Sequence, residues 1–231
     1  MYLALHPFPS NYPVIIFYYF TLVLQIINDY KCILLQTSEL KNFWQDQNVA
    51  IVFFRRWGCM FCRLWAKELH DIAPVLKNNN IRLIGVGVEE AGSKEFIDGK
   101  YFDGELFYAE DRSIYQKLGF KRFNVVTILT SLLWKQSREA IAKGNKMGLG
   151  GDMKGDWVQT GGMLLVEKGG KLINHFKQTG PSDHLSNEEI LKCFGLEHEY
   201  NAETMANKKR EDMECSVCII LIYIFLLSYN F

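Results

Sequence analysis

The sequence has no excess of charge of either sign, because 26 Lys and Arg residues balance 26 Asp and Glu residues. A chain without net charge has no bulk field that attracts nucleic acid or an anionic membrane, so we expect no nucleic-acid partner. It also has no Asn-x-Ser/Thr acceptor, and its six cysteines are too sparse and irregular for a secreted disulfide scaffold. These absences predict a cytosolic protein whose thiols stay reduced.

Nucleotide and metal motifs are absent as well. The chain has neither a G-x-G-x-x-G fingerprint nor a Walker A lysine, although glycine is dense from Gly144 to Gly162. No strand-to-helix transition surrounds this stretch, so the pattern favours a flexible or functional surface loop over a phosphate cradle. Cysteine and histidine do not occur at the spacing of metal fingers, and we predict no metal centre.

The two ends are apolar but short. The run from Val14 to Ile27 has fewer than the roughly 20 residues of a spanning helix, no Lys or Arg precedes it, and no clear cleavage site follows it. It is therefore either a packed extension or a membrane or targeting segment. The C-terminal run begins at a second CxxC, Cys215 and Cys218, which lacks the partners of a zinc site and leaves a tail anchor or lipidation open.

The chain is accordingly divided into three parts. We predict a hydrophobic N-terminal extension over residues 1–30, one folded domain over 31–198, and a C-terminal tail with a short apolar segment over 199–231. We predict a cytosolic protein, and the apolar runs at its two ends leave membrane association as a second possibility. The candidate catalytic cysteines, Cys59 and Cys62, lie in the central part.

Strand-like and helix-like segments alternate in that domain. Val49 to Phe54 is a β-branched and aromatic run that predicts a central strand covered on both faces. From Cys62 onward, apolar residues recur at helical spacing as far as Leu76, with Pro74 as a candidate kink. Ile81 to Val88 then predicts a second buried strand, so the unit is strand, helix, strand.

The rest of the domain predicts a third strand near residues 104–111, a short helix ending at Gly119, and helix within 124–146. Two strand-like runs flank Gly169-Gly170 and predict a β-hairpin. Ser186 and Glu189 form a capping box at the start of a last helix, which stops at Gly195. The predicted class is α/β, with a thioredoxin-like fold, a mixed central sheet, helices on both faces and a peroxiredoxin-like insertion.

Cys59 and Cys62 lie at the strand-helix junction. A thiol at the start of a helix faces free backbone N–H groups and the positive end of the helix dipole, which favour the thiolate. Cys59 is therefore the candidate nucleophile, and Cys62, three residues later, is the candidate resolving thiol. Half of a zinc site or a structural pair are the alternatives. Arg55 and Arg56 either add positive potential to the thiol or form a solvated strand end.

Several segments, in order, resemble the peroxiredoxin-like 2 family. They are RRWGCMFCRLWAKEL, IRLIGVGVEE, FIDGKYFDGELFYAED, YQKLGFKRFN, GDWVQTGGMLLVEKGGK and HFKQTGPSD, and the resemblance covers about residues 31–196. It implies a thioredoxin-like fold and a two-electron reduction of the endoperoxide of prostaglandin H or prostamide H to the F form. It also implies that Cys59 and Cys62 are the catalytic pair and that NADPH is the reductant, used directly or through a thioredoxin-type partner.

Two departures from better-known relatives narrow the prediction. The P-x-x-x-T/S-x-x-C motif of a typical peroxiredoxin is replaced by Val52 and Arg56 before Cys59, which argues against fast hydrogen-peroxide chemistry. The cis-proline that faces the cysteines of thioredoxin is replaced by Gly161-Gly162, which argues against general disulfide exchange. The alternative function is a thioredoxin-like redox regulator or an antioxidant peroxide reductase without prostanoid specificity. His70, Cys32 and Cys193 are interpreted as surface or packing residues.

Overall fold

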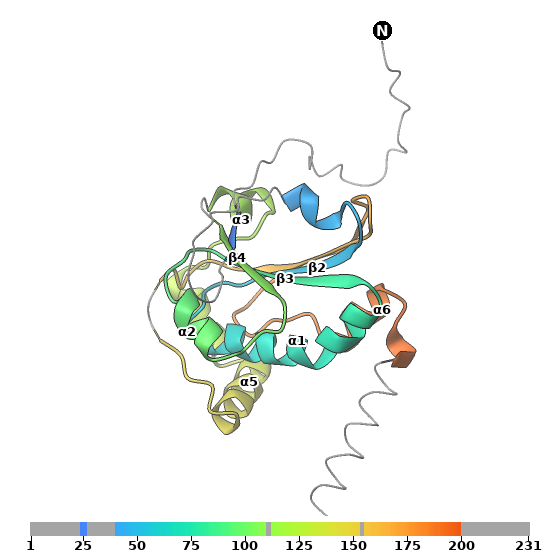
Figure 1. Ribbon diagram of the computed structural model, residues 1–231. Helices are drawn as coiled ribbons and strands as arrows, with labels where there is room; N and C mark the ends of the chain where they lie inside the picture. Colours follow the sequence, from blue (N-terminus) through green and yellow to red (C-terminus); the bar gives the residue numbers. More distant parts are fainter. Residues whose placement is uncertain (1–23, 27–39, 110–111, 153–154, 200–231) are drawn as a thin grey trace, which may run out of the picture.

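The computed structural model describes residues 24–26, 40–109, 112–152 and 155–199, which form one sheet with helices on both faces (Figure 1). The strands are ordered β1-β4-β3-β2-β5-β6. In chain order the elements are β1 (Leu24–Ile26), η2 (Leu40–Trp44), β2 (Asn48–Phe53), α1 (Met60–Asn78), β3 (Ile81–Gly87), α2 (Ser93–Asp98), β4 (Glu105–Ala109), α3 (Ser113–Lys117), α4 (Val125–Ser131), α5 (Lys135–Lys146), β5 (Gly162–Val166), β6 (Leu172–Lys177) and α6 (Asn187–Cys193).

The central strand β2 is covered on both faces, as predicted. Ala50 and Val52 join the core beneath α1 and α6, whereas Val49 and Ile51 join the core beneath η2 and α3. This division follows the two-residue period of a strand. Each of these four side chains is fully buried, and such burial stabilises the fold by roughly 1.5–3 kcal/mol per large aliphatic side chain.

The sheet connectivity confirms the thioredoxin-like order. β2 pairs with β3 in parallel, with α1 as the connection, and pairs with β5 antiparallel on its other side. β5 and β6 form the predicted hairpin, where Gly169 and Gly170 adopt φ of 85° and 96°, in the left-handed region that favours glycine. The capping box of Ser186 and Glu189 is present at the start of α6.

α1 begins at Met60, with Cys59 as its N-cap, slightly earlier than the apolar period alone indicated. Its buried face includes Trp65, Leu69, Ile72 and Leu76, which confirms the predicted core-facing side. Pro74 lies within the helix, and the helix continues past it to Asn78. The CxxC therefore sits at one end of a 19-residue helix whose apolar face is held in the core.

The insertion between α3 and β5 differs in part from its prediction. The helix expected within 124–146 is confirmed, but it is divided into α4 and α5 around Leu132–Trp134. The following glycine-rich segment does not lie free on the surface. Asp152 donates its backbone N–H to the Gly58 carbonyl at 2.9 Å, and Gln159 and Thr160 are almost fully buried, so this segment packs against the CxxC end of α1.

The N-terminal extension contributes to the sheet. Leu24–Ile26 lies within the range predicted as an extension, yet it forms β1, which pairs antiparallel with β4 at the sheet edge. This long-range pairing has no local sequence signal. Most of the run from residue 14 to 27 and all of the C-terminal run from residue 215 lie outside the described residues. No helix among the described residues has the length and apolar character needed to cross a membrane.

Candidate redox site at the start of α1

The two cysteines lie at the junction of β2 and α1 and are nearly closed to solvent. Cys59 is 6% exposed and Cys62 is 1% exposed, and both are free thiols. Cys59 has the extended backbone of an N-cap (φ −82°, ψ 123°), and its carbonyl accepts the Arg63 N–H at 2.9 Å. The Cys59 sulfur therefore lies at the positive end of the helix, as the sequence predicted.

The two thiols have opposite acidities. A hydrogen bond from the Cys62 side chain, together with the charges of Arg55 and Arg56, outweighs burial and holds the pKa of Cys59 well below its usual range. Burial and the neighbouring Cys59 sulfur raise the pKa of Cys62 well above its usual range. Cys59 is therefore poised as a thiolate and Cys62 as a thiol, which is the polarity required of a nucleophile and a resolving partner.

Arg55 makes the direct charged contact with the sulfur. It is 4% exposed, and its Nη1 lies 3.5 Å from Cys59 Sγ. Its Nη2 donates to the Trp157 carbonyl at 2.8 Å and its Nε donates to the Gln159 carbonyl at 3.0 Å. The guanidinium is thus fixed between the insertion and the sulfur. Of the two interpretations of the arginine pair, positive potential at the thiol is confirmed and a solvated strand end is wrong.

Arg56 and Arg63 are tied to an acidic residue that the sequence analysis did not single out. Asp152 lies 3.5 Å from Arg56 Nη1 and 3.6 Å from Arg63 Nη2. Arg63 also donates to the Gly150 carbonyl at 2.7 Å. A side chain on Gly58 would collide with the Asp152 carboxylate, because a Cβ there would lie 2.2 Å from its Oδ1. Glycine before Cys59 therefore allows the insertion to close over the helix start.

Trp57, two residues before Cys59, is held in place by the end of β3 and the loop that follows it. Trp57 is 1% exposed, and its Nε1 donates to the Glu89 carbonyl at 2.5 Å. Its ring lies directly over Gly87, where a Cβ would approach within 2.0 Å of Cζ2. The loop between β2 and α1 is therefore held by the indole ring, and glycine at the end of β3 makes room for it.

His184 and Trp65 are stacked next to this site. Their ring centroids are 4.9 Å apart with an interplanar angle of 12°. His184 Nε2 and Trp65 Nε1 are both buried without a hydrogen-bond partner among the described residues. Burial and the charge of Arg55 lower the pKa of His184 to about 3, so its imidazole is neutral at pH 7. Nothing in the local sequence distinguished His184 from an ordinary loop residue.

The remaining sequence candidates lie elsewhere. His70 is exposed on α1, and Cys193 is half-buried at the end of α6, 3.6 Å from Asn174 Nδ2. Cys32, Cys215 and Cys218 lie outside the described residues. Within the described ranges, no three His, Cys, Asp or Glu side chains gather as a metal site would require.

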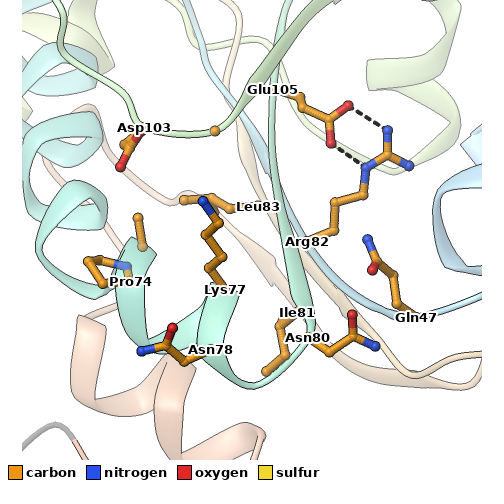
Figure 2. A pocket seen from close by; sticks show the side chains of 12 residues that line it. Gln47, Pro74, Lys77, Asn78, Asn80, Ile81, Arg82, Leu83, Asp103 and Glu105 are labelled. Carbon is orange, nitrogen blue, oxygen red and sulfur yellow. Dashed lines mark hydrogen bonds and ion pairs between the residues drawn. The ribbon is translucent and has the colours of Figure 1, made fainter.

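A pocket of about 650 Å³ lies at the opposite end of α1. Figure 2 shows the Arg82–Glu105 ion pair on one side of it and Lys77 and Asp103 on the other. Arg82 Nη2 and Glu105 Oε2 are 2.6 Å apart. A helix the length of α1 spans ~28 Å, so this hollow is remote from the cysteines. It contains neither cysteine nor histidine.

The topology is thioredoxin-like, and a pair of cysteines at a helix start is the arrangement expected of a thiol oxidoreductase. The family described as AhpC/TSA antioxidant enzyme matches residues 68–180. The reduced 2-Cys peroxiredoxin of Plasmodium vivax aligns with 71% of this chain and 85% of its own, at 12% identity and a TM-score of 0.45.

Sequence relatives are much closer. Prostamide/prostaglandin F synthase of Bos taurus is 44% identical over 165 residues, which are 71% of this chain and 82% of the relative. The human protein of that name is 40% identical over 177 residues, or 76% and 89% of the two chains. The chain therefore belongs to the prostamide/prostaglandin F synthase family, and it is an enzyme of the oxidoreductase class. The resemblance to the peroxiredoxin-like 2 proteins is confirmed.

Proposed function

We propose that this enzyme reduces the endoperoxide of prostaglandin H or prostamide H to the F form through Cys59 and Cys62, with NADPH as the ultimate reductant. The observation that carries the proposal is the Arg55 contact with Cys59 Sγ, in a pair whose second thiol stays protonated. The names of the family relatives supply the substrate class. The weak O–O bond is the electrophile that such a thiolate attacks.

The two thiols supply both of the electrons that reduction of the endoperoxide requires. The Cys59 thiolate attacks one endoperoxide oxygen, the O–O bond breaks, and the other oxygen leaves as an alkoxide that takes a proton from solvent. The product of this step is a sulfenate ester on Cys59. The Cys62 sulfur then attacks the Cys59 sulfur, a disulfide forms, and the second oxygen leaves and takes the proton of the Cys62 thiol. The substrate gains two electrons and the dithiol loses them.

NADPH would supply the two electrons that return the disulfide to the dithiol, either directly or through a thioredoxin-type partner. The glycine-rich segment offers no fit for its phosphates. The Asp152 backbone N–H, a donor of the kind that binds phosphate, already donates to the Gly58 carbonyl, and Gly151 packs against the Gly58 carbonyl and the Met60 backbone. The proposed mechanism therefore assigns no residue of that segment to the dinucleotide. We propose the cytosol as the working compartment, because catalysis requires the pair to be reduced again.

A second candidate is an antioxidant peroxide reductase or redox regulator without prostanoid specificity. The match to the family described as AhpC/TSA antioxidant enzyme favours it. This candidate would use the same thiols and the same arginine. It differs in the oxidant that reacts fastest with Cys59.

One assay separates these functions. The full chain is incubated with prostaglandin H, tert-butyl hydroperoxide or an insulin disulfide, each with NADPH alone and with NADPH, thioredoxin and thioredoxin reductase. We expect endoperoxide reduction to the F form to be the fastest reaction. Faster reduction of the hydroperoxide, with no formation of the F product, would replace the first candidate by the second. Comparison of the two NADPH conditions identifies the electron route.

A further inference from the structure

A charged cluster made of Glu89, Arg112, Arg122 and Asp156 lies next to the segment that holds Arg55. The Asp156 carboxylate accepts from Arg112 Nη1 at 2.9 Å and from Arg122 Nη1 at 2.5 Å. Arg112 also donates to Glu89 at 2.9 Å, and Glu89 Oε1 accepts the Asp156 backbone N–H at 2.9 Å. The cluster therefore ties α3 and the loops after β3 and α3 to one point of the insertion.

Asp156, which the charged cluster holds in place, is close in sequence to both residues whose carbonyls bind Arg55. Trp157 and Gln159, which follow Asp156, accept from Arg55 Nη2 and Nε. Between them, the Val158 N–H donates to Asp156 Oδ1 at 3.1 Å, so the carboxylate also fixes the turn. With two of its nitrogens engaged, the guanidinium directs Nη1 to Cys59 Sγ at 3.5 Å. A continuous chain of contacts thus joins Asp156 to the sulfur.

An ion pair that served only to stabilise the fold would not need a buried carboxylate between two half-exposed arginines. The side chains of Arg112 and Arg122 are 48% and 46% exposed, whereas that of Asp156 is 5% exposed. Ion pairs with an exposed partner contribute little to the free energy of folding. A buried charge is costly to desolvate, and the protein loses stability when one partner of that charge is removed. Burial raises the pKa of Asp156, but the hydrogen bonds from Arg122 and the Val158 N–H, together with the charges of Arg122 and Arg112, lower it below its usual value, so the carboxylate stays ionised. The buried Asp156 carboxylate therefore lies where it can orient the Trp157 and Gln159 carbonyls that bind Arg55.

We propose that Asp156 is a positioning residue, which acts through the Trp157 and Gln159 carbonyls to hold Arg55 against the Cys59 sulfur. This inference rests on the proposed role of Cys59 as nucleophile. Asp156 does not touch the reacting atoms. Its effect is to keep the positive charge of Arg55 within reach of the thiolate, which Arg56, Cys62 and the helix end also stabilise.

The test measures the acidity of Cys59 without any prostanoid. Full-length wild type and Asp156→Asn are alkylated with iodoacetamide from pH 4 to pH 10, and the Cys59 peptide is quantified by mass spectrometry. We expect the alkylation midpoint to rise by about one pH unit, which is about a tenfold loss of thiolate below the midpoint. Asp98→Asn is the matched control, because it breaks an exposed ion pair with Lys94 that is separate from the contacts of Arg55. Its midpoint stays at the wild-type value.

A double-mutant cycle then distinguishes positioning from general loosening. If Asp156 acts through Arg55, adding Asp156→Asn to Arg55→Gln shifts the midpoint no further than Arg55→Gln alone. Equal shifts in both backgrounds, or an unchanged midpoint in a folded Asp156→Asn protein, would overturn the proposal. If Asp156→Asn does not fold, Arg122→Gln gives a smaller shift and Arg122→Lys restores part of it. Failure of wild type to reduce prostaglandin H would refute the proposed substrate and leave these midpoints unaffected.

Discussion

The two ends of α1 offer two very different environments. At its N-terminal end, Cys59 is nearly closed to solvent and Arg55 is held by three acceptors. At its C-terminal end lies the open pocket of Figure 2, whose Arg82–Glu105 pair has exposed fractions of 26% and 49%. This pocket thus lies at the end of α1 opposite the cysteine pair.

The two ends of α1 therefore differ in both charge and burial. The N-terminal end of a helix is positive and the C-terminal end is negative, so only the first stabilises a thiolate. Arginines that lose their water there interact with the sulfur in a medium of low dielectric constant. At the other end, solvent screens the charges. The following experiments contrast these two ends.

The largest effect is expected from Cys59→Ser. A serine hydroxyl is not ionised at neutral pH, and no sulfenate ester can form on it, so endoperoxide reduction falls to the uncatalysed background. Formation of the F product is followed by mass spectrometry, with Cys193→Ser as the control that keeps activity. Turnover within a few-fold of wild type would remove Cys59 as the nucleophile.

Cys62→Ser is expected to stop the cycle one step later. The Cys59 thiolate still attacks, but no second sulfur resolves the product, so one equivalent of substrate reacts and a Cys59 adduct or sulfenic acid accumulates. Intact-mass spectra after a single addition of endoperoxide detect it. Sustained multiple turnover in this variant would show that another group resolves the intermediate.

Arg55→Gln is expected to weaken the nucleophile without removing it. Loss of the charge 3.5 Å from Cys59 Sγ raises the pKa of the thiol, so the single-turnover rate at pH 6 falls by about tenfold for each pKa unit. The pH profile of that rate moves to higher pH. Arg55→Lys retains the charge but not the fork that binds both the Trp157 and Gln159 carbonyls, so its profile lies between the other two. Identical profiles for all three proteins would contradict the role of Arg55.

His184 predicts a dependence of stability on pH. Its pKa is about 3 when folded and near 6.5 when unfolded, so the unfolded chain binds more protons between these values. The stabilisation is therefore fully present above pH 6.5 and is lost as the pH falls towards 3. Urea unfolding of His184→Phe, which keeps a ring on Trp65, is expected to show a smaller loss of stability with acid. His175, whose pKa is lowered to about 4, accounts for part of the remaining slope.

The smallest effect is expected at the far end of α1. Arg82→Gln breaks the ion pair with Glu105, and exposed pairs contribute about 0–1 kcal/mol to stability. We expect endoperoxide turnover to stay within about twofold of wild type, since an exposed pair contributes so little. A tenfold loss of turnover with unchanged Cys59 alkylation would show that the pocket takes part in the reaction.

Much of the fold was predictable because its signals are local. The two-residue period of β2, the helical period from Trp65 to Leu76, and the capping box at Ser186 each depend on neighbours along the chain. The position of Cys59 at the start of a helix follows from the same patterns. The edge strand Leu24–Ile26 was missed because its pairing with β4 depends on a distant segment.

Local patterns along the chain therefore predict the strand-helix junction, the two thiols at that junction and the order of the elements from β2 onward. The groups that surround the thiols are brought there by packing between distant segments. Arg55 and the Gln159 carbonyl are 104 positions apart, and Arg56 and Asp152 are 96 positions apart. Such contacts have no local period, because they form only when the insertion packs against the sheet and removes water from between charges. That packing lowers the pKa of Cys59 and raises that of Cys62, so the two thiols differ in acidity.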